Sequence, residues 1–366
     1  MDISLFLCGD VMTGRGIDQV LAHPCAPEIH EPYLKSALDY VRIAEETHGA
    51  IPRRVDPSYI WGDALEELER AAPAARIVNL ETAVTSSGDW EAKGINYRMS
   101  PANVACLTAV RIDCCTLANN HVLDWGAAGL DDTLDTLRGA GIKTSGAGRT
   151  REEAEGPAEL PLATGARILA FSLGAPSSGV PRSWAARADR PGVAYLDDLS
   201  GRSIARIAEK IGAVRRPNDL VIVSVHWGPN WGYDVSPEEQ RFARGLVETA
   251  GVDVFHGHSS HHAKGIEVFR GKLILYGCGD LINDYEGIGG HEDFRGDLGL
   301  MYFPRLNAET GELAGLDMRA MQMRRFRLSR ASEADARWIP AMLEREGRRF
   351  RTGAELRADG RIELRF

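Results

Sequence analysis

Side chains that can bind a metal ion or move protons gather at five points of the 366-residue sequence, each directly after an apolar run. The five segments are CGDVMTGRG (8–16), VNLETAVT (78–85), LANNHVLDWG (117–126), VSVHWGPNWG (223–232) and HGHSSHH (256–262). Carboxylate and amide oxygens and imidazole nitrogens are ligands for divalent cations, and imidazole also transfers protons near neutral pH. Thiols are absent from these segments apart from Cys8, so the pattern predicts a mixed oxygen and imidazole metal site.

The apolar runs alternate with amphipathic segments, which predicts an α/β fold. We expect strands at 3–8, 76–80, 112–117, 167–173, 220–226, 252–256 and 298–303, and a hairpin of 265–270 with 272–276 around Gly271. We expect helices at 63–72, 131–140, 201–214, 237–250 and 333–348; Ser236, Pro237 and Glu239 form a start signal for the fourth. The segment 23–60 is expected to be a long, partly helical insertion. Because ligands of α/β sheets bind beyond the carboxyl ends of strands, the five polar segments should meet there.

Two units are expected in one globule. Residues 1–305 carry every candidate site segment, and residues 306–366 form a C-terminal packing extension of a helix and a hairpin, with Asp359-Gly360 as the turn.

Composition argues against several classes of protein. The net charge of −9 is unfavourable for nucleic-acid binding, and the apolar runs are too short to span a membrane. The six cysteines have no C-x-x-C spacing, as expected for buried free thiols, and the N-terminus has no signal-peptide pattern. We therefore expect a cytoplasmic protein without membrane or nucleic-acid partners; the sequence leaves the oligomeric state open.

The motifs GDVM (9–12), NLE (79–81), ANNHVLDWG (118–126), HWG (226–228), GHSSH (257–261) and YGCGDLINDYEG (276–287) together resemble the CapA-type family, named for poly-γ-glutamate capsule biosynthesis, within the calcineurin-like metallo-dependent phosphatase superfamily. The resemblance implies a four-layer αββα sandwich. It also implies a set of metal ligands: Asp10, the Asn79/Glu81 strand end, Asn120, His226, His258 and His261. By the same resemblance, His121 matches a proton-handling histidine.

Two departures from the superfamily pattern bear on the reaction. Met12 stands where ordinary members have a histidine, and Asn79 stands where they have a bridging aspartate. A thioether is a poor ligand for a hard ion and a neutral amide bridges two cations poorly, whereas two-metal hydrolysis needs two ions that share a hydroxide. We therefore expect one divalent ion per chain, with Ca²⁺, Mn²⁺, Zn²⁺ and Fe²⁺ all open.

A single ion with surplus histidine and aspartate favours proton transfer at carbon. The leading hypothesis is a metal-dependent peptide epimerase, an isomerase that inverts the Cα of the C-terminal residue of a ribosomal lasso-peptide precursor, as some CapA-like proteins do. Its partner is then a peptide with a free C-terminal carboxylate. Two alternatives stay open: a metal-dependent hydrolase of phosphoester or amide bonds, acting on polyglutamate for example, and a non-catalytic binder of an anionic polymer.

Under the epimerase hypothesis the candidate residues divide by role. His121 and either His258 or His261 form the acid/base pair, Asp10 and Asp124 orient the imidazoles, and His291 is a second-tier acid/base candidate. Arg15 and Arg98 are candidates to clamp the substrate carboxylate, and Trp227 to line an apolar pocket. His256 and His262 are expected to be mainly structural.

Overall fold

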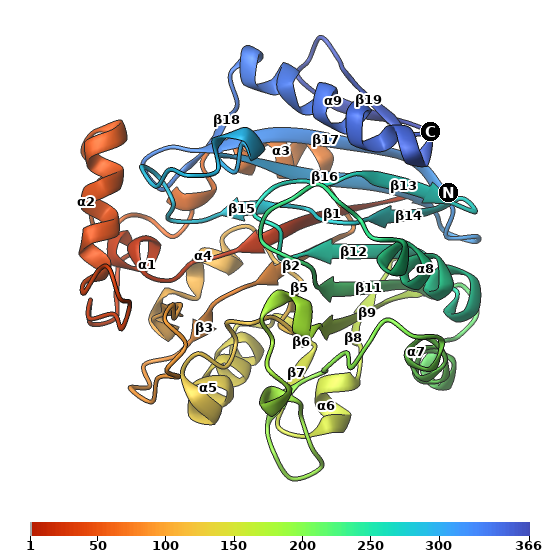
Figure 1. Cartoon of the computed structure of the whole chain (residues 1–366), viewed down its shortest axis with the longest axis horizontal. Coiled ribbons are helices and arrows are strands. Elements are labelled where there is room, and N and C mark those ends of the chain that lie inside the picture. Colours follow the sequence, from red (N-terminus) through yellow and green to blue (C-terminus); the bar gives the residue numbers. More distant parts are fainter. Residues whose placement is uncertain (1) are drawn as a thin grey trace.

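The computed structural model describes residues 2–366 and confirms the α/β class (Figure 1). The larger sheet has ten strands in the order β19-β20-β17-β16-β1-β2-β5-β6, with β15 paired to β1 and β18 to β17. Their bounds are β1 Asp2–Val11, β2 Ala75–Leu80, β5 Cys114–Thr116, β6 Lys143–Ser145, β15 Asp280–Ile282, β16 Leu298–Asn307, β17 Leu313–Met323, β18 Leu328–Arg330, β19 Gly353–Leu356 and β20 Ile362–Arg365.

The smaller sheet has six strands in the order β13-β14-β12-β11-β9-β8. These are β8 Ala158–Pro161, β9 Arg167–Gly174, β11 Leu220–His226, β12 Val254–His258, β13 Ile266–Phe269 and β14 Lys272–Leu275. Two short pairs complete the strands: β3 Ala83–Val84 with β4 Arg98–Met99, and β7 Ala147–Gly148 with β10 Gly192–Val193. In the larger sheet β1 runs parallel to β2 and β15 and antiparallel to β16, and in the smaller sheet β11 runs parallel to β12. Strands β1, β2, β11 and β12 end on the same side of the molecule (Figure 1).

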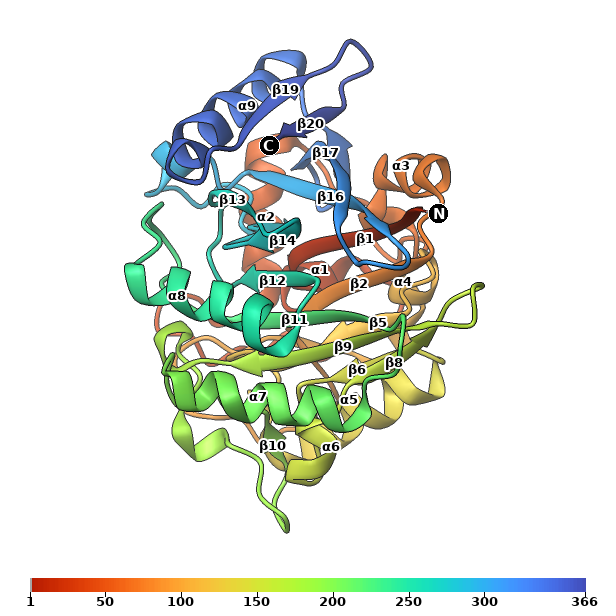
Figure 2. The ribbon, with the colours of Figure 1, turned by 90° about the vertical axis from the view of Figure 1, so that its right-hand side faces the viewer.

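Helices cover the sheets from outside (Figure 2). The helices are α1 Gly16–Val20, α2 Ala37–His48, α3 Ala64–Ala71, α4 Ala105–Thr108, α5 Gly126–Gly139, α6 Arg151–Glu155, α7 Gly201–Val214, α8 Pro237–Gly245 and α9 Glu333–Gly347. Helices α1 to α5 pack on one face of the ten-stranded sheet, and α6, α7 and α8 pack on the outer face of the six-stranded sheet. A third apolar cluster fills the space between the sheets and extends under α9. Alternation along β1 explains this layering, since Leu5 and Leu7 point to the space between the sheets and Phe6 and Cys8 to the helices.

Polar side chains also cross between the two sheets near the strand ends. His256 Nε2 donates to the carbonyl of Cys8 at 2.8 Å, and Ser224 Oγ lies 3.3 Å from Thr116 Oγ1. Ser172 Oγ accepts from the backbone N–H of Ala118 at 3.3 Å. These hydrogen bonds tie β11, β12 and β9 of one sheet to β1, β5 and the loop after β5 of the other.

Most expected elements are present, and the differences have local causes. The helix expected at 237–250 has the predicted capping box, but it ends as α8 at Gly245 and continues as a π-helical turn, Leu246–Ala250. The helix expected at 131–140 begins earlier, at Gly126, where a positive φ of 65° turns the chain. The strand expected at 252–256 lies two residues further along, so β12 includes both His256 and His258 on one face.

The C-terminal segment continues the ten-stranded sheet. Strand β17 pairs antiparallel along β16, and α9 and the hairpin of β19 with β20 follow it. The boundary expected at 305/306 therefore falls inside β16. Within residues 2–366, no helix is both long and apolar enough to cross a membrane.

Candidate metal centre

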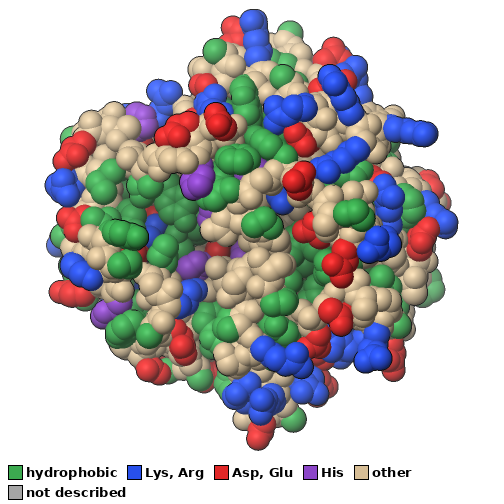
Figure 3. All heavy atoms as spheres, in the orientation of Figure 1, with side chains coloured by type: hydrophobic (Ala, Val, Ile, Leu, Met, Phe, Trp, Pro, Cys, Tyr) green, Lys and Arg blue, Asp and Glu red, His purple; other side chains and the backbone are tan. Residues whose placement is uncertain are grey.

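Three of the predicted ligands converge where the two sheets meet. Asp10 is the penultimate residue of β1 in the larger sheet, whereas His226 and His258 are the last residues of β11 and β12 in the smaller one and are register partners. One ligand atom of each lies within 4.8 Å of the others, and all three side chains are buried. Figure 3 shows histidine side chains around a hollow on this side of the molecule, beyond the strand ends seen in Figure 1.

Hydrogen bonds indicate which imidazole nitrogens carry protons. His256 Nε2 donates to the Cys8 carbonyl, so its Nδ1 accepts from Ser224 Oγ at 3.1 Å. Ser224 Oγ then accepts from His258 Nε2 at 2.7 Å, which leaves His258 Nδ1 unprotonated. By the same reasoning, His226 Nε2 donates to Asn120 Oδ1 at 2.9 Å and leaves His226 Nδ1 unprotonated.

The two unprotonated Nδ1 atoms face one another at 2.8 Å. Asp10 Oδ1 lies 3.7 Å from Nδ1 of His258 and 4.0 Å from Nδ1 of His226. Burial lowers the pKa of both histidines, so they are neutral near pH 7. Two lone pairs and a carboxylate oxygen directed at one point repel one another unless a cation lies between them, so this donor set fits a divalent ion.

Neighbouring groups hold the Asp10 carboxylate in place. Asn79 Nδ2 donates to its Oδ1 at 2.6 Å, and the backbone N–H of Ser259 donates to its Oδ2 at 3.1 Å. Burial, and then the charge of Asp280, raise the pKa of Asp10 to about 7. Ser259 adopts a φ of 101°, a left-handed conformation that is uncommon for a serine and that directs its N–H to the carboxylate.

A buried glutamate lies next to the three ligands. Glu81 Oε1 is 3.7 Å from His226 Nε2 and 3.6 Å from His121 Nε2. Its Oε2 is buried and has no hydrogen-bond partner within residues 2–366. Burial and the nearby Asp10 raise the pKa of Glu81 well above its usual range. An orphaned buried carboxylate oxygen is a second indication that the site fits a cation.

His121 and Asp124 form an imidazole–carboxylate dyad beside the ligands. His121 Nδ1 lies 2.6 Å from Asp124 Oδ2, so Nδ1 carries the proton and Nε2 points toward Glu81. Asp124 also accepts from Lys93 Nζ and from the backbone N–H of Tyr97, each at 2.7 Å. Burial lowers the pKa of His121 to about 4, so the imidazole is a neutral base at pH 7.

A second dyad lies on another side of Asp10. His261 Nδ1 is 3.0 and 3.1 Å from the two oxygens of Asp280, which also accepts from Asn283 Nδ2 at 3.0 Å. Burial acts to lower the pKa of His261, but the charge of Asp280 outweighs it and the pKa rises. The two dyads are connected through tyrosines: Tyr97 packs edge-on to His121, Tyr285 packs edge-on to His261, and their hydroxyls are 2.6 Å apart.

The predicted residues thus divide into several groups. Asp10, His226 and His258 form the ligand cluster, with Asn120 and Glu81 beside it. Asn79 contacts Asp10 through its amide nitrogen and so supports a ligand, and His261 belongs to the second dyad outside the cluster.

The other predicted histidines lie outside the ligand cluster. His291 lies further out, stacked on Trp231 with ring centroids 4.1 Å apart. His256 and His262 are buried, and His256 has the structural hydrogen bonds expected of it.

The three residues expected to contact substrate, Trp227, Arg15 and Arg98, make contacts within the chain instead. Trp227 is a correction: it is 3% exposed, packs on Phe255 in the outer core and donates to the carbonyl of Tyr276, so it lines no open pocket.

The two arginines are engaged within the chain. The guanidinium of Arg15 is buried and bound by Asp284 and Glu31, so its bidentate face is already occupied. Arg98 stacks on Trp125 at 3.9 Å and donates to the backbone carbonyls of Ser87 and Ala26.

Sequence reasoning missed four residues of the site: Asp280, Lys93, Tyr97 and Tyr285. A signal for Asp280 was available, because the tripeptide Cys-Gly-Asp occurs at both 8–10 and 278–280. The two copies lie side by side, with Asp10 and Asp280 as register partners of β1 and β15. A Cβ on Gly9 would lie 1.7 Å from the carbonyl oxygen of Gly279, so only glycine allows this approach.

The fold and the site thus define an α/β protein with a buried histidine–carboxylate centre at the ends of its strands. Similarity to known proteins shows the family to which it belongs. The family model described as "Bacterial capsule synthesis protein PGA_cap" matches residues 4–285. The chain belongs to this bacterial capsule synthesis family, which confirms the CapA-type resemblance.

Among curated relatives, a probable polyglutamine synthesis accessory protein of Mycobacterium tuberculosis is 47% identical over 99% of this chain and 96% of its own length. The PGA biosynthesis protein CapA of Bacillus subtilis is 26% identical over 56% of this chain and 52% of its own length. A solved structure, GAP50, the anchor in the inner membrane complex of Plasmodium, aligns over 93% of this chain and 95% of that chain with 10% identity and a TM-score of 0.32, too low to support an inference. The names of these relatives refer to capsule and polymer synthesis, and they give no support to the lasso-peptide epimerase hypothesis.

Proposed function

We propose that this protein is a metal-dependent hydrolase that cleaves an amide bond of a glutamate or glutamine polymer during its synthesis. The observation that carries the proposal is the pair of unprotonated Nδ1 atoms of His226 and His258 beside Asp10, with the His121–Asp124 dyad next to them. The choice of polymer rests on the names of the relatives, which refer to polyglutamine and PGA. A metal-dependent hydrolase is also one of the two alternatives to the epimerase that the sequence leaves open.

The residues present fit one divalent cation. Asp10, His226 and His258 would hold it, and Glu81 and Asn120 border the same space. The chemistry that such a cation supplies is polarisation of a carbonyl or phosphoryl oxygen and a lower pKa for water.

The protein's own residues would then handle the protons of hydrolysis. His121 Nε2 accepts a proton from the attacking water, because Nδ1 is held by Asp124 and the imidazole is neutral. The same Nε2 returns this proton to the leaving nitrogen as the C–N bond breaks, so the products are an amine and a carboxylic acid, whose proton then passes to the amine to give a carboxylate and an ammonium group. Asp124 stabilises the imidazolium between these two steps, and Lys93 fixes the orientation of Asp124.

The layering also supports assignment to the calcineurin-like superfamily. Two sheets pack through a shared apolar cluster, helices lie on both outer faces, and the candidate ligands end strands of both sheets. We propose that the four-layer αββα sandwich of that superfamily is the architecture of this chain.

The test combines metal analysis with turnover. Purified protein is loaded with Mn²⁺, Zn²⁺, Fe²⁺ or Ca²⁺, dialysed, and incubated with poly-γ-glutamate and with glutamine oligomers; chain length is read by mass spectrometry and new amines by labelling. We expect one retained ion per chain, lost in His226→Ala. We expect Asp124→Asn to keep the ion but lower kcat/KM by about 10²–10⁴, and Asp135→Asn, an exposed substitution on α5, to change neither. Unchanged metal content in His226→Ala, or polymer cleavage that is equal in Asp124→Asn, would refute the proposal.

Epimerisation at Cα remains a second candidate because a specific observation favours it. The chain has two imidazole–carboxylate dyads, His121–Asp124 and His261–Asp280, and inversion of a carbon centre needs a base and an acid on opposite faces. Incubation with peptides in D₂O separates the reactions. Incorporation of one deuterium at Cα without cleavage indicates an epimerase, whereas shortened chains without deuterium at Cα indicate a hydrolase.

A further inference from the structure

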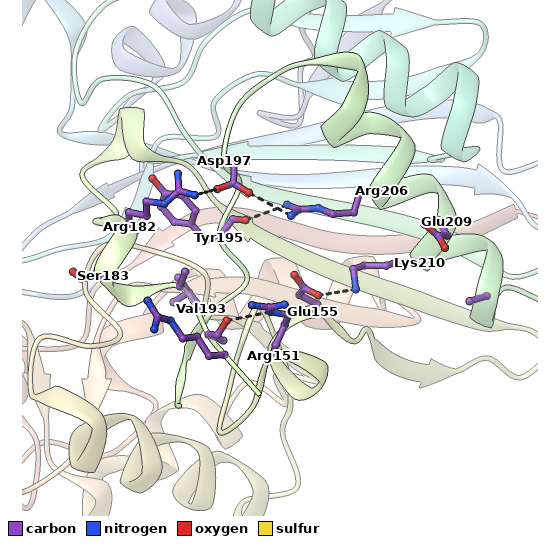
Figure 4. A pocket seen from close by; sticks show the side chains of 14 residues that line it. Arg151, Glu155, Arg182, Ser183, Val193, Tyr195, Asp197, Arg206, Glu209 and Lys210 are labelled. Atoms are coloured by element: carbon purple, nitrogen blue, oxygen red, sulfur yellow. Dashed lines mark hydrogen bonds and ion pairs between the residues drawn. The ribbon is translucent and has the colours of Figure 1, made fainter. Parts of the chain in front are cut away.

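A cavity of about 840 Å³ lies apart from the histidine-rich centre, between α6, α7 and the segment 182–197 (Figure 4). Its inner surface includes small or aromatic residues, among them Ala185, Ala186, Val193 and Tyr195. Charged side chains from the two helices and the segment surround this surface (Figure 4). The cavity is thus of a size that accommodates a small ligand or a short stretch of polymer.

The charge of this cavity is opposite in sign to that of the whole chain. Five cationic side chains and three carboxylates line it, a net charge of +2, whereas the chain carries −9. The cationic groups are Arg151, Arg182, Arg187, Arg206 and Lys210, and the carboxylates are Glu155, Asp197 and Glu209. A local excess of positive charge on an acidic protein attracts anions selectively to this place.

Two of the three carboxylates already have partners within the cavity. Asp197 lies 3.3 Å from both Arg182 and Arg206, and Glu155 lies 2.6 Å from Lys210 (Figure 4). The carboxylate of Asp197 therefore marks a position where an anion is held between two guanidinium groups. Such partly exposed pairs contribute little to stability, so an incoming anion can compete for the same donors.

Two arginines of the cavity are without an acidic partner. Within residues 2–366, no carboxylate lies within 4.0 Å of the guanidinium of Arg151 or Arg187, unlike those of Arg182 and Arg206. The backbones of the two residues are joined, since the N–H of Arg151 donates to the carbonyl of Arg187 at 2.8 Å. This bond keeps the two residues next to one another at the cavity. The Nε of Arg151 donates to the carbonyl of Ala186 at 3.4 Å, and no carboxylate of the described residues occupies its terminal nitrogens. A guanidinium group binds a carboxylate or phosphate through two parallel hydrogen bonds.

We propose that this cavity is a binding site for an anionic ligand that carries at least two carboxylate or phosphate groups. Arg151 and Arg187 bind one group, and Arg182, Arg206 and Lys210 bind a second by exchanging their internal carboxylates for those of the ligand. The neutral inner surface, with Tyr195, accommodates the part of the ligand between the charges. The proposal does not depend on the reaction catalysed at the metal centre.

One short segment links the cavity indirectly to the metal centre. Arg182 and Ser183 line the cavity, and the next residue, Trp184, is buried with Lys93 Nζ 5.2 Å from its ring. Lys93 in turn contacts Asp124 of the His121 dyad. A ligand in the cavity therefore contacts the same segment that covers Lys93.

The experiment measures binding of two probes to the full chain in the presence of EDTA, so that the metal centre contributes nothing. A fluorescently labelled hexaglutamate peptide is followed by anisotropy, and inorganic tripolyphosphate by calorimetry. The test variant is Arg151→Ala/Arg187→Ala. The matched control is Arg42→Ala/Arg337→Ala, which removes two exposed arginines from α2 and α9.

We expect at least one probe to bind, with affinity that falls as salt rises, and about tenfold or greater weakening in the test variant. The control should bind within about twofold of the wild type, and His226→Ala should bind normally, which separates this site from the proposed hydrolase. Binding of hexaglutamate alone identifies a polycarboxylate ligand, and binding of tripolyphosphate alone a phosphorylated one. If neither probe binds, or if the control variant loses as much affinity as the test variant, the proposal is wrong.

Discussion

Replacement of Arg15 by methionine should destabilise the protein strongly. The guanidinium is buried, and it donates to Asp284 at 3.1 and 2.5 Å and to Glu31 at 2.8 Å. Methionine fills a similar volume but leaves two carboxylates buried without their cation. Removing one partner of a buried ion pair costs about 3–5 kcal/mol, and the remaining N–H donor of Gly16 to Asp284 compensates only in part.

The expected change in melting temperature follows from the size of the chain. At about 2.1 cal/mol/K of unfolding entropy per residue, a loss of about 4 kcal/mol lowers Tm by about 5 °C. Calorimetry and urea unfolding measure this directly. Arg15→Lys should lose about half as much, since lysine keeps the charge but not the bidentate geometry.

The control is Arg337→Met, which removes an exposed ion pair on α9 and should leave Tm unchanged. Limited proteolysis adds a local measurement, because Arg15 links the start of α1 to Glu31 and Asp284, and its loss should expose the segment between α1 and α2. A Tm for Arg15→Met within 1 °C of the wild type would refute the reasoning and return Arg15 to the set of candidate substrate-binding residues.

Three further predictions concern packing and ionisation. Burial, and then Asp18, raise the pKa of Cys25 to about 12. Because only the thiolate reacts, iodoacetamide labelling of native Cys25 at pH 9 should be at least about a hundredfold slower than in urea and should rise with pH up to about 12; equal rates would contradict this. Lys264→Met should raise Tm by a few degrees, since burial lowers the pKa of this lysine and its ammonium donates to a backbone carbonyl, that of Asp234, at 3.3 Å; a lower Tm would contradict it. Gly9→Ala should abolish metal retention and lower Tm, whereas Gly201→Ala, with open space around the new methyl, should do neither.

The sequence predicts the strand-end residues well because their signal is local. An apolar run that stops at a polar residue identifies Asp10, His226 and the histidines of 256–262 without knowledge of the fold. Parallel strands then bring these residues to one edge, which explains why the predicted ligands converge.

The remaining residues depend on contacts between distant segments. Lys93 and Tyr97 lie in an irregular segment, and their hydrogen bonds to Asp124 span 31 and 27 residues, a pairing that no local pattern encodes. Trp227 follows a strand directly, and only the turn after β11 decides that its indole enters the core. Arg15 was a candidate to clamp a substrate carboxylate, and its actual partners, Glu31 and Asp284, lie 16 and 269 residues away in the sequence, so no local pattern points to them.

The hydrogen bonds between the two sheets have a consequence for how accurately the centre is built. The apolar cluster between the sheets holds them together, but its free energy changes little when one sheet slides slightly against the other, because apolar contacts are not directional. The bond from His256 to the Cys8 carbonyl and the contact of Ser224 with Thr116 do depend on direction and distance. Cys8, Ser224 and His256 lie two residues before Asp10, His226 and His258. These hydrogen bonds therefore fix the position of one sheet relative to the other at the place where the metal ligands of the two sheets must meet.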